Sequence, residues 1–267
     1  MIRMKKNKET LQADLNILKE EYIKLLNDKD VLDNWGKPQL AALYATRIGY
    51  LQVEKLQLQL RIKGQKRKIE MVQSAINRNV PVDIMAIELL VATELAEAEY
   101  RIMQETGKIE NARNLLSNLS SPERSSELRK LYRQMAKQLH ADINPGLTEE
   151  QQQIWLQLKD AYQAGDLEKL KAMELIYENQ LKAASAAQQE LTEEELLLKI
   201  EVLKEGCVVL NEQIKQIKSE FPFTIELQIK DEVWVAEEQD KLKKEITALN
   251  LYETELTLQY QQIIGAL

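Results

Sequence analysis

The sequence predicts an all-α protein built from long helices, and three observations lead to that expectation. Only eight glycines and five prolines occur in 267 residues, so the secondary-structure elements must be few and long. Aromatic residues make up only 5% of the chain, and the abundant Leu, Gln, Lys, Glu and Ala are typical of helices and coiled coils. Apolar residues also recur at alternating steps of four and three, the spacing of a coiled-coil seam. We expect long antiparallel helical hairpins (coiled coil) flanking a small helical module.

Residues 1–112 are expected to form an N-terminal helical arm. The first seam contains Leu11, Leu15, Leu18, Tyr22 and Leu25. The cluster at 34–38 (Asn-Trp-Gly-Lys-Pro) predicts a chain reversal, after which a second helix with Lys55 in its seam would pair antiparallel with the first. A second stop at 79–81 precedes a helix whose apolar face carries Ile84, Ile87, Val91, Leu95, Ala98 and Ile102.

Residues 181–267 are expected to form a C-terminal antiparallel coiled-coil hairpin. Thr192 and Glu195 match a capping box, which marks the start of a helix. The seam of that helix is the most regular in the chain: Leu196, Ile200, Leu203, Cys207, Leu210, Ile214, Ile217 and Phe221. After 221–223 the returning helix carries Leu242, Ile246, Leu249, Leu256, Tyr260 and Ile263, with Glu253 interrupting the seam.

Residues 113–180 change pattern to short helices with explicit caps, so we expect a compact module there. Ser120 and Glu123 form a capping-box pattern, and a helix should begin near Pro122. Its buried face would carry Leu128, Leu131, Met135 and Leu139, and a basic stripe would carry Arg129, Arg133 and Lys137. A polar loop at 140–147 separates it from a helix that Thr148 and Gln151 cap, in which Trp155 and Tyr162 point inward. Gly165 and Asp166 end that helix and cap the next one.

This order of parts resembles the J-domain of DnaJ-type co-chaperones. That family has a basic helix, a His-Pro-Asp loop and an antiparallel helix that carries a large aromatic residue and Ala-Tyr. Here residues 128–145 resemble the second helix and the loop, and Trp155, Leu158, Ala161 and Tyr162 resemble the third helix. The resemblance spans roughly residues 115–174.

The resemblance implies a partner-binding surface for a DnaK-type chaperone. His140 and Asp142 would be the main loop residues, on either side of Ala141. Tyr132, Arg129 and Arg133 would lie on the docking face, with Lys137 as a further basic contact. Cationic side chains of this kind pair with an acidic groove and accelerate encounter.

Ala141 stands where the family carries proline. Proline fixes its own φ and disfavours helical geometry at the preceding residue, so alanine removes a constraint that presets the loop. Two hypotheses therefore stay open. The chain is a J-domain-like co-chaperone or adaptor whose arms hold a client or an assembly, or it is a coiled-coil scaffold whose module binds or packs without stimulating an ATPase.

Composition and motifs argue against other functions. The net charge of −7 is spread over both signs, which disfavours nucleic-acid binding, and no apolar run is long enough for a membrane span or a signal-peptide core. Cys207 is the single cysteine and His140 the single histidine, so we expect no metal site, no cofactor and no catalytic nucleophile with its base. We expect a cytoplasmic, non-enzymatic protein, and the seams leave a homo-oligomer open.

Overall fold

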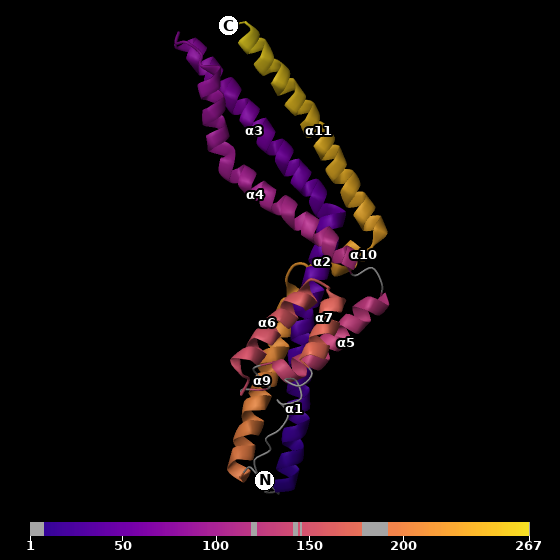
Figure 1. Ribbon diagram of the computed structural model, residues 1–267. Coiled ribbons are helices and arrows are strands. Elements are labelled where there is room, and N and C mark those ends of the chain that lie inside the picture. Colours follow the sequence, from indigo (N-terminus) through magenta and orange to yellow (C-terminus); the bar gives the residue numbers. More distant parts are fainter. Residues whose placement is uncertain (1–7, 119–121, 141–143, 145, 178–191, 267) are drawn as a thin grey trace, which may run out of the picture. The chain divides into compact units, whose positions relative to one another are not determined.

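Every regular element that the computed structural model describes is helical, over residues 8–118, 122–140, 144, 146–177 and 192–266. The α-helices are α1 (Lys8–Val31), α2 (Lys37–Tyr44), α3 (Tyr50–Asn77), α4 (Ile84–Asn118), α5 (Pro122–Leu139), α6 (Glu149–Gln163), α7 (Leu167–Ile176), α9 (Glu193–Ser219), α10 (Glu226–Lys230) and α11 (Glu232–Gly265) (Figure 1). Two π-helical segments, η1 (Leu32–Gly36) and η2 (Ala45–Gly49), and the 3-10 turn η3 (Phe223–Ile225) complete the set. The predicted all-α fold class is confirmed.

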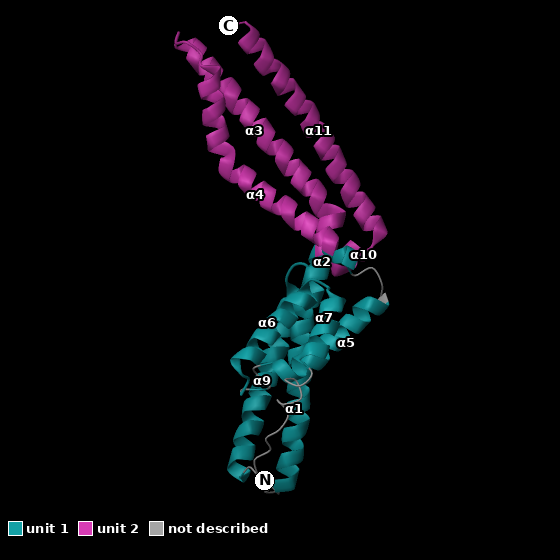
Figure 2. Ribbon diagram, viewed as in Figure 1, with its two compact units in different colours: residues 1–41, 115–225 teal, residues 42–114, 226–267 magenta. Residues whose placement is uncertain are grey.

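The chain forms two compact units, each assembled from distant parts of the sequence. Unit 1 comprises residues 1–41 and 115–225, and unit 2 comprises residues 42–114 and 226–267 (Figure 2). Each unit therefore pairs a segment of the N-terminal arm with a segment from the C-terminal part of the chain.

The predicted reversal at 34–38 is wrong, because helical structure continues without a break from Lys8 to Asn77. At η1 the backbone bonding widens, and the N–H of Lys37 donates to the carbonyl of Leu32 five residues earlier. Pro38, which has no N–H to donate, follows at once, so the widened turn accommodates it inside a helix. Gly36 serves close packing, since a Cβ there would lie 3.2 Å from the Phe223 ring.

In unit 1, α1 pairs with α9 and the two helices run parallel. Their first turns share one apolar cluster of Leu11, Leu15, Leu196 and Ile200. Further along both helices, the Tyr22 ring of α1 lies over Gly206 of α9, where a Cβ would approach the ring to 2.7 Å. Of the seam predicted at 196–221, Leu196, Ile200, Cys207 and Leu210 are buried, whereas Phe221 at its end is 51% exposed, which corrects the prediction there. The partner of this seam is α1 and not the returning helix.

The rest of unit 1 is a module of α5, α6 and α7 packed around a shared apolar core. Buried residues of all three helices form it: Leu128, Leu131, Tyr132, Met135, Ala136, Leu139, Ile154, Leu158, Ala161, Tyr162, Leu167, Leu170 and Met173. Trp35 of η1 belongs to the same core. The module therefore packs on the segment that continues α1.

In unit 2, α3 pairs with α11, again in parallel. Three contacts advance together along both helices: Lys55 with Glu245 at 2.5 Å, Arg61 with Glu253 at 2.6 Å, and Gln65 with Thr257 at 3.3 Å. Both predicted antiparallel hairpins are therefore corrected, the first because α1 to α3 form one continuous helical run and the second because α9 and α11 pair with different segments of that run.

An antiparallel α3–α4 hairpin adds the third helix of unit 2. α3 ends where Asn79 adopts a φ of 53°, and α4 begins at Ile84, so the stop predicted at 79–81 is confirmed. Val91 and Leu95 of α4 join Val72 of α3 and Tyr260 of α11 in one core. Arg67 reaches back to Glu94, which is consistent with the reversed direction.

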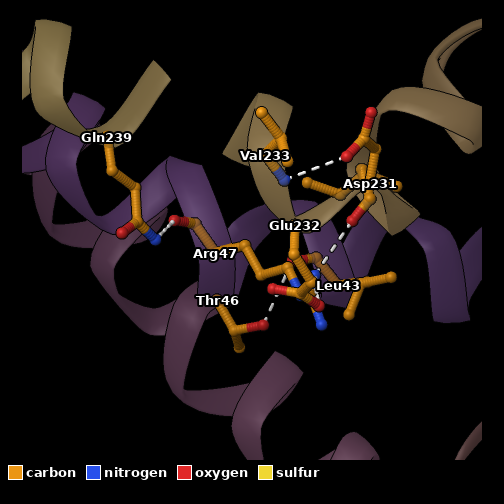
Figure 3. Close-up of polar contacts among 8 residues, drawn as sticks. Leu43, Thr46, Arg47, Asp231, Glu232, Val233 and Gln239 are labelled. Atoms are coloured by element: carbon orange, nitrogen blue, oxygen red, sulfur yellow. Dashed lines mark hydrogen bonds and ion pairs between the residues drawn. The ribbon is translucent and has the colours of Figure 1, made fainter. Parts of the chain in front are cut away.

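Arg47 fixes the start of α11 inside unit 2. Its guanidinium donates to the Glu232 carboxylate at 2.7 Å (Figure 3). It also donates to the carbonyl of Ile229 at 3.2 Å. The side chain of Gln239 donates to the Arg47 carbonyl at 2.7 Å, within the π-helical turn η2 (Figure 3). The π-helical turn is thus stabilised by side-chain hydrogen bonds across to α10 and α11.

Candidate functional site

The candidate site is built on α5 and α6, which are antiparallel and separated by a short connection. Tyr132 of α5 stacks on Tyr162 at a centroid distance of 3.9 Å, and His140, just beyond the end of α5, meets Trp155 at 5.0 Å. The contacts follow opposite orders along the two helices, so the chain reverses between them. The Thr148–Gln151 capping box starts α6, and Asp166 caps α7 after Gly165 at a φ of 68°, as predicted.

Asn144, beyond the end of α5, bonds back to the last turn of that helix. The side-chain amide of Asn144 donates to the carbonyls of Lys137 and Gln138 at 3.0 and 2.9 Å. The N–H of Asn144 donates to the His140 carbonyl at 2.9 Å. These bonds satisfy carbonyls that a helix end otherwise leaves without partners, so Asn144 anchors the position of His140.

Tyr132 was predicted on the docking face, and the structure corrects that placement. Its side chain is fully buried, because its ring is stacked on Tyr162 and on Trp155, at 3.9 and 5.9 Å. Trp35 stacks on the other partner, Tyr162, at 5.1 Å. Burial raises the pKa of both tyrosine hydroxyls, so the phenols stay neutral. The predicted core role of Tyr162 is confirmed, and Trp155 is partly buried against the same core.

His140 faces α1 instead of open solvent. Its Nε2 lies 3.5 Å from Oδ2 of Asp30, and only 14% of the His140 side chain and 15% of the Asp30 side chain are exposed. Burial raises the pKa of the Asp30 carboxyl above its usual value, while the charges of His140, Lys159 and Lys29 oppose that rise. The loop histidine is therefore held by an acidic residue of its own chain.

The basic stripe lies beside a groove of about 1110 Å³ between α1 and α5. Arg129 is half-buried and donates to the Ser125 carbonyl at 3.2 Å, whereas Arg133 and Lys137 are exposed. Across the groove, Arg133 lies 4.0 Å from Asp28 of α1. The predicted stripe thus lines one surface, but α1 forms the opposite wall.

Ala141 and Asp142 lie outside the described residues, as does Ser120 of the predicted capping box, so the loop is known here from its two flanks. His140 and Asn144 bracket it, and Arg129, Arg133 and Lys137 precede it on α5.

Sequence reasoning missed the two carboxylates of α1. Asp28 and Asp30 lie more than 100 residues from the histidine and arginine that they contact, so periodicity along one helix could not pair them. One feature of the sequence could have indicated these carboxylates: three acidic residues, Asp28, Asp30 and Asp33, are concentrated directly before the buried Trp35.

Metal sites and membrane-spanning helices are not found in the described part of the chain. No group of three or more potential metal-ligating side chains occurs among the described residues. None of the described helices combines the length and the apolar character that crossing a bilayer requires.

Comparisons with protein-family models, with curated protein sequences and with solved structures find no match to this chain.

Proposed function

We propose that this chain is a helical scaffold whose J-domain-like module is docked on its own α1 and serves assembly without stimulating an ATPase. The contact between His140 and Asp30 carries the proposal. An imidazole that is 14% exposed and faces a carboxylate at 3.5 Å is poorly placed to engage a second protein. Without a loop proline at position 141, the chain also lacks the constraint that would present this histidine.

The charges around the groove support the same conclusion. In the J-domain family, the basic helix meets acidic groups of the chaperone. Here Asp28 and Asp30 of α1 already face Arg133 and His140, so the module's cationic face has an acidic partner within the chain. An external partner would have to displace these contacts before it could use the same side chains.

The second candidate is a co-chaperone that docks on a DnaK-type chaperone. The open cationic surface favours it, because Lys24 of α1 and Arg129, Lys130, Arg133 and Lys137 of α5 line the groove against only two carboxylates, Glu20 and Asp28. An excess of positive charge attracts acidic surfaces and increases association rates.

Single-turnover ATP hydrolysis by a DnaK-type chaperone separates the two candidates. The scaffold proposal predicts no acceleration by the wild-type chain, and wild-type acceleration that His140→Gln abolishes would replace the scaffold with the co-chaperone. Acceleration only by Ala141→Pro or by the double variant Asp28→Asn, Asp30→Asn would support the proposal that Ala141 and the α1 carboxylates keep the module from docking.

A matched binding experiment tests the groove itself. Arg133→Ala should weaken any binding to the chaperone if the groove is the docking surface, whereas Lys218→Ala, which removes an exposed cation from α9, should leave it unchanged. Equal binding by both variants would mean that the basic stripe is a solvated face.

A further inference from the structure

α4 carries a second apolar stripe beside its packed face, and Met103 and Gly107 at its far end border an open groove of about 910 Å³ between α3 and α4. Its members are Met85, Leu89, Ala92, Ala96, Tyr100, Met103 and Gly107. At 3.6 residues per turn they fall within about 80° of the helix circumference and extend over about 33 Å. All are exposed, with Met85 81%, Leu89 71%, Met103 63% and Tyr100 56% accessible. No charged residue belongs to this stripe.

The packed face of α4 is a different one. Ile87, Val91 and Leu95 are buried in the core of unit 2, and around the helix they lie about 60° to 140° from the nearest edge of the exposed stripe. A solvent-facing side of a helix in a monomer ordinarily carries charged and polar residues. Four exposed large apolar side chains along one uncharged stripe indicate a surface that a partner covers.

The spacing of the stripe is symmetric about Ala96. The steps from Met85 to Ala96 are four, three and four, and the steps from Ala96 to Gly107 are again four, three and four. A two-fold axis through Ala96 would place a second antiparallel copy in register with the first. Such an interface is self-complementary, as cyclic symmetry requires.

We propose that the α4 stripe is the interface of a homodimer in which two copies of α4 pack antiparallel about Ala96. Met85 then faces Gly107 of the second copy, and Tyr100 faces Ala92, so large side chains meet small ones. Leu89 faces Met103, and the two Ala96 residues on the axis allow a close approach of the helices. A parallel pair would stack Met85 on Met85 and leave a gap at Gly107.

Gly107 supports this partner independently. Glycine inside an exposed helix costs roughly 0.5–1 kcal/mol relative to alanine. Nothing within the described chain lies within 4 Å of the position that its Cβ would occupy, so intrachain packing does not require a glycine there. The approach of Met85 from a second copy would require one.

The buried area also suits a second copy that associates reversibly. Two helices in contact over this length at the usual separation bury on the order of 800 Å² in total. Stable protein dimers bury about 1,200–2,000 Å². The stripe therefore predicts a dimer that forms on concentration and dissociates on dilution, and this inference does not depend on the function of the module.

Cysteine cross-linking tests the geometry on a Cys207→Ala background. Ala96→Cys should form an interchain disulfide, because the axis brings the two residues within bonding distance. Ala86→Cys, an exposed alanine of the same helix outside the stripe, is the matched control and should not. A mixture of Leu89→Cys and Met103→Cys should cross-link as a heterodimer if the helices are antiparallel, while Leu89→Cys alone should not. Cross-linking of Ala96→Cys no faster than Ala86→Cys would overturn the proposal.

Sedimentation of the cysteine-free background and of charge variants tests the same surface without a covalent bond. The background protein should shift from monomer to dimer as its concentration rises. Met103→Glu should remain monomeric at the same concentrations, whereas Gln104→Glu, which adds the same charge one residue outside the stripe, should still dimerise. A background protein that stays monomeric, or a Met103→Glu variant that dimerises normally, would overturn the interface. Unchanged helical circular dichroism would show that the variants are folded.

Discussion

The module of unit 1 and the α3–α11 pair of unit 2 are both helical, yet different interactions hold them. The module encloses stacked rings, with Tyr132 and Tyr162 fully buried and 3.9 Å apart. The α3–α11 pair joins two long helices along a narrow seam, edged by ion pairs such as Arg61–Glu253. The module gathers its buried residues in one cluster, so each of them contacts several others, whereas the elongated pair distributes buried residues such as Leu58 and Val72 along a narrow seam.

The largest expected effect comes from emptying the module core. Tyr162→Ala should lower the free energy of unfolding of unit 1 by about 3–5 kcal/mol, because it leaves a cavity where two aromatic rings now stack. Hydrogen exchange should show loss of protection in α5 to α7 and little change in α3 and α11. Tyr162→Phe is the matched control. The buried hydroxyl of Tyr162 has no hydrogen-bond partner among the described residues, so removing it should change the free energy of unfolding little. Equal losses of hydrogen-exchange protection in both units after Tyr162→Ala would contradict the comparison.

A smaller effect is expected at the close approach of α1 and α9. Gly206→Ala places a Cβ 2.7 Å from the Tyr22 ring and should destabilise unit 1 by about 1–3 kcal/mol. Gly107→Ala, in open space on α4, should stabilise its helix by about 0.5–1 kcal/mol when measured on dilute monomer. Urea denaturation of both variants checks the opposite signs, and destabilisation by both would mean that backbone effects outweigh packing.

Asp30 gives the module a pH dependence. Its pKa is raised by burial, against the opposing charges of His140, Lys159 and Lys29 and with a smaller contribution from Asp33. The folded state therefore holds this proton more tightly than the unfolded state, and stability falls as pH rises from the unfolded pKa to the folded one. Asp30→Asn should stabilise unit 1 at neutral pH by on the order of 1 kcal/mol and should lose that advantage near pH 4. A variant less stable than wild type at pH 7 would show that the contact with His140 outweighs the burial of the carboxylate.

The smallest effect is expected for the exposed ion pairs of unit 2. A double-mutant cycle of Arg61→Ala and Glu253→Ala should give a coupling of about 0.2–1 kcal/mol, because Arg61 is about half exposed and solvent screens the pair. The coupling should shrink further in high salt. A coupling of several kcal/mol would place this pair among the main determinants of the α3–α11 contact.

Periodicity alone predicted many, but not all, of the buried residues of the long helices. Leu196, Ile200, Cys207 and Leu210 are buried as the α9 seam requires, and Leu242, Ile246, Leu256 and Tyr260 are buried on α11. Periodicity did not identify the partner helices, because any apolar seam fits several others. The two charged interruptions did carry that information: Lys55 pairs with Glu245 and Glu253 pairs with Arg61, and both pairs join α3 to α11.

At the candidate site, too, the sequence predicted local features but not the contacts between distant segments. The bounds of α5 and the caps of α6 and α7 follow from local residues, and the sequence predicted them. The burial of Tyr132 did not follow, because the aromatic stack depends on Tyr162 and Trp35 from other segments. The contact of His140 with Asp30 likewise depends on how α1 packs against the module.

The accessibility of His140 tests most directly the claim that α1 holds the module's loop histidine. This is the only histidine in the chain, so its modification by diethyl pyrocarbonate can be followed on one peptide by mass spectrometry. We expect the folded wild type to react several-fold more slowly than the urea-unfolded chain, and Asp30→Ala to react faster than the folded wild type. A folded wild-type chain that reacts as fast as the unfolded one would contradict the account.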